Sequence, residues 1–171
     1  MTSKLHDALA FAVSAHRGQD RKHTGLPYVT HPIAVMEIVQ TVEHTEEMLI
    51  AALLHDVVED TDIGLTAIQN KFGIEVALLV EQLTDISKPS DGNRAIRKEI
   101  DRKRLLGSSN EVKTIKLADL IHNSSSIVRY DPEFAKVYMK EKELLLHALK
   151  GGSDELMEKA ESIISNYYHS L

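Results

Sequence analysis

Helical periodicity runs through almost the whole chain and limits the folds that it can adopt. Apolar residues recur at three- and four-residue spacing, beginning with Leu5, Ala8, Leu9 and Ala12, and this spacing predicts amphipathic helices. No segment alternates apolar and polar residues as a half-buried strand would, and no internal repeat is evident. The sequence therefore predicts an all-α fold, a compact bundle of about eight to nine helices in a single domain over residues 1–171.

Proline, glycine and short polar runs mark the ends of the expected helices. The third helix is apolar nearly all round, so we expect it at the centre of the core. The expected helices are a first one that ends near residue 18, one that opens at 31–32, one from 45 to about 60, and others at 65–72, 73–84, 94–106, 111 to about 125, 131–149 and from 153 onward.

Composition excludes several classes of function. The formal net charge is -6, from 20 Lys and Arg against 26 Asp and Glu, which argues against a nucleic-acid polymer as partner because duplex binding needs a basic face. There is no cysteine, so disulfides and thiolate metal sites are excluded. The longest apolar run, Met48–Leu54, is too short to span a bilayer, and no signal-peptide pattern is present. We therefore expect a soluble, cytoplasmic protein with no membrane partner.

The most apolar segment ends in an acidic motif that stability alone does not explain. Residues 55–60 read His-Asp-Val-Val-Glu-Asp. Carboxylates at the C-terminal end of a helix oppose its dipole, and i, i+4 spacing stacks His55 over Glu59 and Asp56 over Asp60. A divalent cation would offset the repulsion between the carboxylates and use them as ligands. The competing interpretation is a solvated acidic helix end.

Two further segments carry side chains that bind metals. Asp119 and Asn123 are four residues apart on an expected helix, so a carboxylate and an amide share one face. His31 stands at the entrance of another helix. Taken singly, these residues have ordinary explanations as a satisfied buried aspartate and a capping or surface histidine. Together, His31, His55, Asp56 and Asp119 predict a site for Mn²⁺, Fe²⁺ or Zn²⁺, because all four ligands are imidazole or carboxylate.

At these positions the sequence resembles the HD metal-dependent phosphohydrolases, and more closely the hydrolase domain of the RelA/SpoT homologues. The flanking motifs agree as well: Arg-Lys at 21–22, YVTHP at 28–32, LLHDVVEDT at 53–61 and KLADLIHN at 116–123. The resemblance covers nearly the whole chain, which has no room for the synthetase and regulatory domains of the long homologues. It implies an HD-domain fold and a small stand-alone alarmone hydrolase.

The resemblance also implies a metal centre and a water-activating pair. The metal ion, usually Mn²⁺ with Fe²⁺ or Zn²⁺ as alternatives, would be held by His31, His55, Asp56 and Asp119. Glu59 and Asp60 would then orient the attacking water and take its proton. The implied reaction removes pyrophosphate from the 3′ position of guanosine tetra- or pentaphosphate and leaves GDP or GTP.

Contacts to the substrate, a small nucleotide polyphosphate, follow from the same resemblance. Phosphate and nucleotide contacts would come from Arg21, Lys22, Asn123, Tyr138 and Lys98. Phe134 stands where some relatives carry an arginine, and the register around Lys98 is not fixed, so that a solvated charged helix face is the competing interpretation there. Local cations of this kind reconcile a polyanionic substrate with a net charge of -6.

Other functions remain open at this point. Adenosine alarmones need only a different base pocket, and removal of the 2′-phosphate of NADPH, an activity known in metazoan relatives, needs no new chemistry. A non-catalytic nucleotide sensor ranks lower because every expected ligand and acidic position is filled. A cyclic-dinucleotide phosphodiesterase is disfavoured by the Glu-Asp that follows His55-Asp56 and by the Arg-Lys loop. A purely structural helical protein ranks last, because it leaves the acidic cluster unexplained. A homodimer is the remaining partner to consider, since the apolar residues Ile163, Ile164, Tyr167 and Tyr168 could pack internally or across a dimer.

Overall fold

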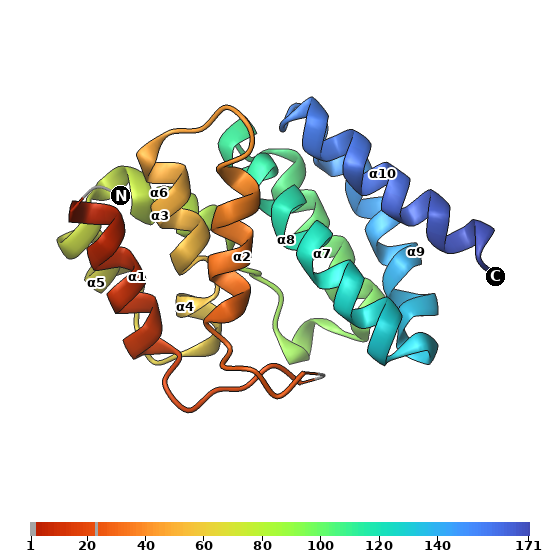
Figure 1. The fold of residues 1–171 in the computed structure, drawn as a ribbon, viewed down its shortest axis with the longest axis horizontal. Coiled ribbons are helices and arrows are strands. Elements are labelled where there is room, and N and C mark those ends of the chain that lie inside the picture. Colours follow the sequence, from red (N-terminus) through yellow and green to blue (C-terminus); the bar gives the residue numbers. More distant parts are fainter. Residues whose placement is uncertain (1–2, 23) are drawn as a thin grey trace. The chain divides into compact units, whose positions relative to one another are not determined.

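The computed structural model describes residues 3–22 and 24–171, and within them the fold is all-α as expected (Figure 1). This part of the chain contains ten α-helices, of which α4 is a single turn, and one short 3₁₀ helix. The helices are α1 Ser3–Ala15, α2 Thr30–Val39, α3 Glu46–Leu54, α4 Val57–Asp60, α5 Leu65–Phe72, α6 Ile74–Leu83, η1 Pro89–Asp91, α7 Arg94–Leu106, α8 Asn110–Tyr130, α9 Pro132–Ala148 and α10 Asp154–His169.

The chain forms two compact units, Met1–Thr84 and Asp85–Leu171. In the first unit, α3 packs against α1, α2 and α6, and all residues from Met48 to Leu54 are buried. The expected central position of this helix within its unit is confirmed. The Thr45 side chain accepts a hydrogen bond from the Met48 N–H and caps the helix at its start, as Thr followed by two glutamates indicates.

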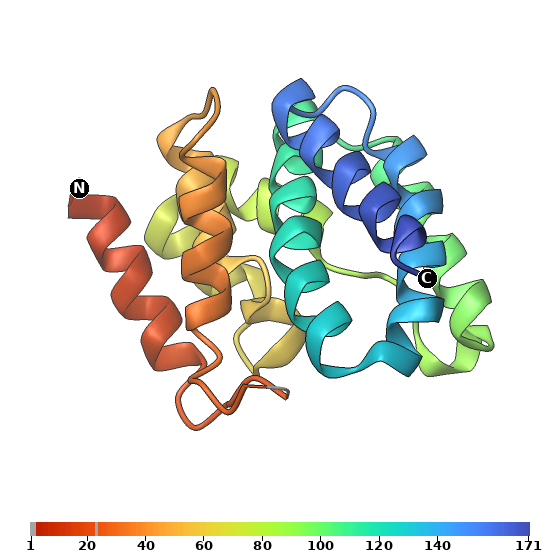
Figure 2. The same ribbon diagram turned by 45° about the vertical axis from the view of Figure 1, so that its right-hand side comes forward.

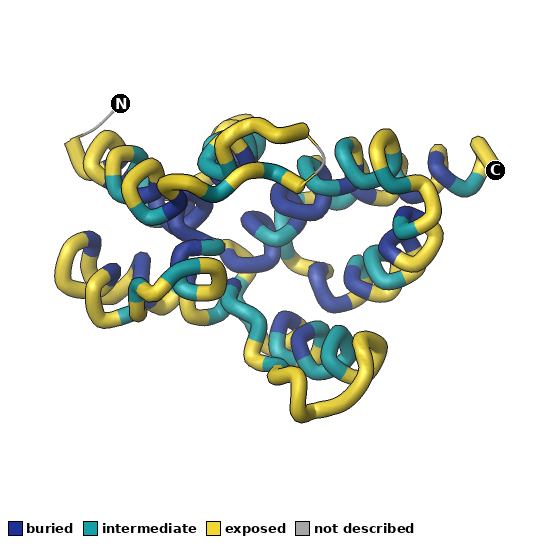
Figure 3. Tube along the Cα trace, turned by 90° about the horizontal axis from the view of Figure 1, so that it is seen from below, coloured by how far each residue is buried: buried dark blue, intermediate teal, exposed yellow. Residues whose placement is uncertain are grey.

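The second unit consists of η1 and helices α7–α10, with α8, α9 and α10 packed against one another and α7 against α9 (Figure 2). Ala135, Tyr138 and Met139 of α9 form its buried cluster with Ile164 and Tyr167 of α10. Figure 3 shows buried residues along the helices and mostly exposed residues along the connecting loops. The prediction of one domain over the whole chain stays a prediction.

The C-terminal apolar residues pack internally. Ile164 and Tyr167 belong to the buried cluster, while Ile163 and Tyr168 are partly buried against it. Of the two alternatives for these side chains, packing within the unit is the one observed, and the homodimer stays a prediction. None of the described helices combines the length and the apolar character that crossing a membrane requires.

Most helix boundaries agree with the expected ones within a few residues, but the third helix does not continue to residue 60. It ends at Leu54, and His55 and Asp56 form a turn before α4 begins at Val57. The His55 Nδ1 donates to the Ala52 carbonyl at 2.8 Å, a group that a continuous helix pairs with the Asp56 N–H. The His55 ring thus takes a backbone acceptor at the point where α3 stops.

Helix α8 is longer than expected and runs on to Tyr130. The expected end lay in the serine run, yet Ser124, Ser125 and Ser126 each donate their hydroxyl hydrogen to a carbonyl three or four residues earlier. These hydroxyls are therefore satisfied without leaving the helix. The helix ends at Asp131, whose side chain accepts from the Phe134 N–H and caps α9 instead.

Candidate metal centre

The turn between α3 and α4 brings together three side chains that can bind a metal. One ligand atom from each of His31, His55 and Asp56 lies within 4.8 Å of the others. The Asp56 Oδ2 is 3.1 Å from the His55 Nε2 and 3.5 Å from the His31 Nε2. Both imidazoles are buried, with 1% and 2% of their side chains exposed. His31 enters the cluster from the first turn of α2, so two helix ends converge on one point.

The protonation of His55 suits a metal ligand. Because a carbonyl oxygen only accepts, the hydrogen bond to Ala52 fixes the proton on the Nδ1 of His55 and leaves the Nε2 lone pair directed at Asp56. Metal-binding histidines are commonly oriented by such a bond from the second ring nitrogen. The donor set of two imidazoles and one carboxylate therefore fits Mn²⁺, Fe²⁺ or Zn²⁺.

Tyr28, a residue that the sequence analysis did not single out, orients the carboxylate of the cluster. Its hydroxyl donates to the Asp56 Oδ2 at 2.7 Å. Burial first, and then the charge and hydrogen bond of Asp56, raise the pKa of the Tyr28 phenol above its ordinary value, so that the hydroxyl keeps its proton and remains a donor. Only the motif YVTHP, which places this tyrosine three residues before His31, could have indicated it.

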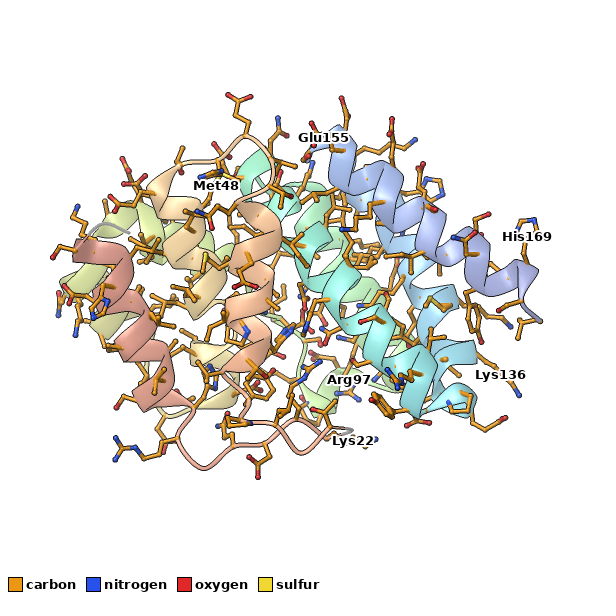
Figure 4. All side chains as sticks on the ribbon, in the orientation of Figure 1. Lys22, Met48, Arg97, Lys136, Glu155 and His169 are labelled. Atoms are coloured by element: carbon orange, nitrogen blue, oxygen red, sulfur yellow. The ribbon has the colours of Figure 1, made fainter. Side chains whose placement is uncertain are left out.

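A hairpin-like loop between α1 and α2 carries the predicted phosphate-binding pair. Asp20 and Pro27 form a β-bridge across it, and the Gln19 Nε2 donates to the Asp60 carbonyl at 2.8 Å, which ties the loop to α4. The guanidinium of Arg21 lies 5.8 Å from the centroid of the Tyr28 ring. Lys22 is exposed on the same loop (Figure 4). The structure thus places Arg21 beside the tyrosine that holds Asp56.

The predicted water-activating pair lies on the single turn α4. Glu59 and Asp60 are both exposed, and the Asp60 N–H donates to the Asp56 carbonyl at 2.9 Å. Partial burial and the like charge of Asp56 raise the pKa of the Asp60 carboxyl, which makes its carboxylate a stronger base. Both residues line a cavity of about 610 Å³ in the first unit, but His31, His55 and Asp56 do not.

The remaining predicted ligand, Asp119, lies in the second unit on α8. It is buried, and the Lys116 Nζ lies 2.9 Å from its Oδ2. The Asn123 Nδ2 donates to its Oδ1 at 2.6 Å. The expected sharing of one helix face by Asp119 and Asn123 is therefore confirmed, whereas their roles toward a metal ion and a nucleotide stay predictions.

The other substrate residues predicted in the second unit have partners within that unit. The Lys98 Nζ lies 2.7 Å from the Asp85 Oδ2. Tyr138 is buried on α9, its ring centroid is 6.1 Å from that of Phe134, and the Arg94 guanidinium lies over the Phe134 ring at 5.0 Å. An arginine from α7 thus lies against an aromatic ring of α9.

Comparison with known proteins places this geometry in a family. A family model for the HD domain matches residues 8–148. The chain belongs to the HD domain family. The matched residues include His31, His55, Asp56 and Asp119, and the family resemblance noted from the motifs is confirmed.

Several relatives of this chain are named as, or described as, hydrolases of guanosine tetraphosphate. Human MESH1, a guanosine-3′,5′-bis(diphosphate) 3′-pyrophosphohydrolase, is 38% identical over 139 residues, which cover 77% of this chain and 73% of MESH1. A probable enzyme of the same name from Synechocystis is 38% identical over 129 residues, 74% of this chain and 17% of that protein. The solved structure of a metazoan SpoT ortholog that hydrolyses ppGpp matches with a TM-score of 0.88 and 32% identity, covering 97% of this chain and 96% of that one.

The long relatives differ from this chain in extent. The chain spans 17% of the Synechocystis protein and 15% of a rice chloroplastic protein named as a putative GTP diphosphokinase. Similarity to the long proteins is thus confined to a small part of them, while MESH1 and the metazoan SpoT ortholog match over most of their length.

Proposed function

We propose that the chain is a metal-dependent hydrolase of (p)ppGpp-type alarmones that removes the 3′-diphosphate as pyrophosphate and leaves GDP or GTP. The proposal depends above all on the buried His31–His55–Asp56 cluster, which lies in an HD domain. Relatives named as 3′-pyrophosphohydrolases support the choice of substrate, because MESH1 and the metazoan SpoT ortholog match most of this chain.

The proposed metal ion is Mn²⁺, with Fe²⁺ and Zn²⁺ as alternatives that the same donors accept. His31, His55 and Asp56 would hold it, with Asp119 as the fourth ligand that the family resemblance implies. A divalent ion polarises a phosphoryl oxygen and lowers the pKa of water, which supplies a nucleophile at neutral pH.

The remaining roles belong to the side chains around the cluster. Tyr28 keeps Asp56 in one orientation through its hydroxyl. Asp60, with its raised pKa, and Glu59 are the bases proposed to take the proton of the attacking water. Arg21 and Lys22 lie on the loop before α2, where they would neutralise phosphate charge as it develops.

Turnover assays on chelated and reloaded protein test this proposal. The purified chain is stripped with a chelator, reloaded with Mn²⁺, Fe²⁺ or Zn²⁺, and incubated with ppGpp, while ion-exchange chromatography follows GDP and pyrophosphate. We expect equal amounts of both products with metal and none after chelation. Orthophosphate as the product, or turnover that is unchanged in the stripped protein, would contradict the assigned chemistry.

A substrate panel separates the alternatives that share this site. The same assay with ppApp and NADPH measures the preference for the base and for the position of the phosphate. We expect kcat/KM to be highest for ppGpp, because the relatives that match most of this chain are named for the guanosine compound or hydrolyse it. Release of orthophosphate from NADPH without turnover of either alarmone would assign the protein to a different reaction.

A further inference from the structure

A small cavity in the second unit is lined by side chains of α7, α8 and α9. Its volume is about 50 Å³, which is room for roughly three to five water molecules. Such a volume suits one tetrahedral oxyanion and is too small for a nucleoside. Four of the residues that line it are cationic, namely Lys98, Arg102, Lys116 and Lys142.

The carboxylates around this cavity already have other partners. The Asp85 Oδ2 pairs with the Lys98 Nζ at 2.7 Å. Glu141 accepts two hydrogen bonds from the guanidinium of Arg94, at 2.6 and 2.8 Å. Burial raises the pKa of Asp85, but the charges of Lys116 and Lys98 outweigh this effect, and the net pKa lies below its usual range. Asp85 is therefore ionised and engaged at neutral pH.

The third acid that lines the cavity, Asp101, is engaged in the same way. Asp101 accepts hydrogen bonds from the N–H groups of Ile86 and Ser87 at 3.0 and 2.9 Å, and from the Ser87 hydroxyl at 2.8 Å. Asp119 does not line the cavity, but its Oδ2 lies 2.9 Å from the Nζ of Lys116, which does. No acid that lines the cavity has its main interaction with Lys142.

Lys142 is the cation of the cavity that has no acidic partner in these pairings. Its Nζ lies 4.8 Å from the centroid of the Tyr138 ring, and with residues 3–22 and 24–171 it makes no hydrogen bond or ion pair. The side chain is partly buried. Burial, followed by the like charges of Lys116 and Lys98, lowers the pKa of Lys142 to about 8. A partly buried ammonium group without a counter-charge is costly, and an anion would remove that cost.

We propose that Lys142 is the anchoring cation of an anion-binding subsite on the second unit, and that the subsite takes one phosphate group of a nucleotide polyphosphate. The identity of the molecule that carries this phosphate rests on the proposed function. The charge and size of the cavity do not depend on the proposed function, because any phosphate oxyanion would meet the same ammonium group.

The proposal moves the phosphate contact in this unit from Lys98 to Lys142. The Lys98 Nζ already has the Asp85 carboxylate at 2.7 Å, and 38% of its side chain is exposed. A phosphate that approached Lys98 would compete with a carboxylate in hydrogen-bond contact. At Lys142 it would meet a donor with all three N–H groups available, so the net gain is larger.

Calorimetry with inorganic pyrophosphate on the full-length, chelator-treated chain tests the subsite without any turnover. Lys142→Met removes the charge at similar length, and Lys140→Met is the matched control, because Lys140 is an exposed lysine on the same helix. We expect Lys142→Met to weaken pyrophosphate binding about 10-fold or more and Lys140→Met to leave it within about 2-fold. Lys142→Arg, which keeps the charge, should retain most of the affinity.

Kinetics and thermal unfolding separate this inference from the proposed function. With ppGpp as substrate, Lys142→Met should raise KM about 10-fold and change kcat much less, as expected for a contact made before the chemical step. Its Tm should be equal to or higher than that of the wild type. Pyrophosphate binding that depends on Lys142 in a protein without turnover supports the subsite and refutes the proposed function. Wild-type affinity and KM in an active Lys142→Met variant refute the subsite alone.

Discussion

The two units of the chain gather charge of opposite kinds and hold it differently. In the first unit, two buried imidazoles and a carboxylate converge at the break between α3 and α4, a set of donors suited to a cation. In the second unit, α7, α8 and α9 direct four cationic side chains at one small cavity, a set suited to an anion. A divalent metal can polarise a phosphoryl oxygen and supply a nucleophile, and cationic side chains can stabilise the charge of a phosphate group.

The difference lies in what the protein itself supplies to each group. In the first unit, a hydrogen bond from within the unit orients the donor, as Ala52 does for His55 and Tyr28 does for Asp56. In the second unit, the hydrogen bonds go to the acids, and Lys142 forms no ion pair with the residues that the structure describes. The first site is therefore preorganised for its ligand. In the second site, a bound ligand would supply part of the stabilisation of the Lys142 charge.

Removal of a clustered histidine should give the largest effect. We expect His55→Ala to lose the bound metal and to reduce turnover of ppGpp by more than the roughly 10–100-fold cost of losing an outer partner. Metal content measured by atomic emission, together with kcat, checks this. His6→Ala is the matched control, because His6 is exposed on α1 and lies outside the cluster. A stoichiometric metal ion in His55→Ala would show that the cluster is not the metal site.

Tyr28→Phe tests whether orientation by the protein matters in the first unit. The change removes the 2.7 Å hydrogen bond to Asp56 but keeps the ring. We expect metal affinity or kcat to fall about 10–100-fold, measured by competition with a fluorescent chelator and by turnover. Tyr130→Phe, at an exposed tyrosine of α8, should change neither quantity. Equal behaviour of the two variants would contradict the orienting role.

Local sequence patterns predicted much of the first site. The helix that begins at Thr45 and the positions of His31, His55 and Asp56 follow from capping signals, apolar periodicity and motif spacing, which act over a few residues. The helix end was missed because apolar periodicity continues past it and does not report the hydrogen bond that the His55 ring makes to the Ala52 carbonyl.

Long-range contacts account for what the sequence could not predict. Tyr28 meets Asp56 only because the loop before α2 is tied to α4 through Gln19 and the Asp60 carbonyl. Lys142 looked like one more charge on an amphipathic helix, since its lack of an acidic partner depends on pairings made by other residues. Among these is the contact of Arg94 with Glu141, which are 47 residues apart in the sequence.

Asp101→Ala should loosen the wall of the cationic cavity. Asp101 is 5% exposed and accepts two backbone N–H groups and the Ser87 hydroxyl, so its loss removes the acceptor of three partly buried hydrogen bonds. We expect the free energy of unfolding to fall by about 1–3 kcal/mol, a Tm lower by roughly 2–12 °C. Glu133→Ala, at a glutamate that is 83% exposed and paired with Lys136, should change Tm little. A similar small change in both variants would show that Asp101 does not order this wall.

The titration of Lys142 should give the smallest effect, but it tests the difference between the two units most directly. Four charged groups act on it: Lys116 and Lys98 lower its pKa, while Asp119 and Glu141 raise it, and with burial the net value is about 8. Following its ¹³Cε signal in the chelated protein should give a midpoint near pH 8, and saturating pyrophosphate should move the midpoint upward because a bound anion favours the ammonium form.

The shifted pKa of Lys142 also makes the stability of the fold depend on pH, and a neighbouring lysine serves as the control. Because the pKa of Lys142 is lower in the folded chain than the roughly 10.4 of an unfolded lysine, its charge destabilises the fold fully below about pH 8. That cost shrinks as pH rises from there toward the unfolded pKa. The Tm advantage of Lys142→Met over the wild type should therefore be largest at neutral pH and disappear near pH 10.5, while Lys140→Met should show no such trend. A midpoint that pyrophosphate leaves in place, or a Tm difference independent of pH, would mean that Lys142 already has its counter-charge within the protein and that both units are complete without a ligand.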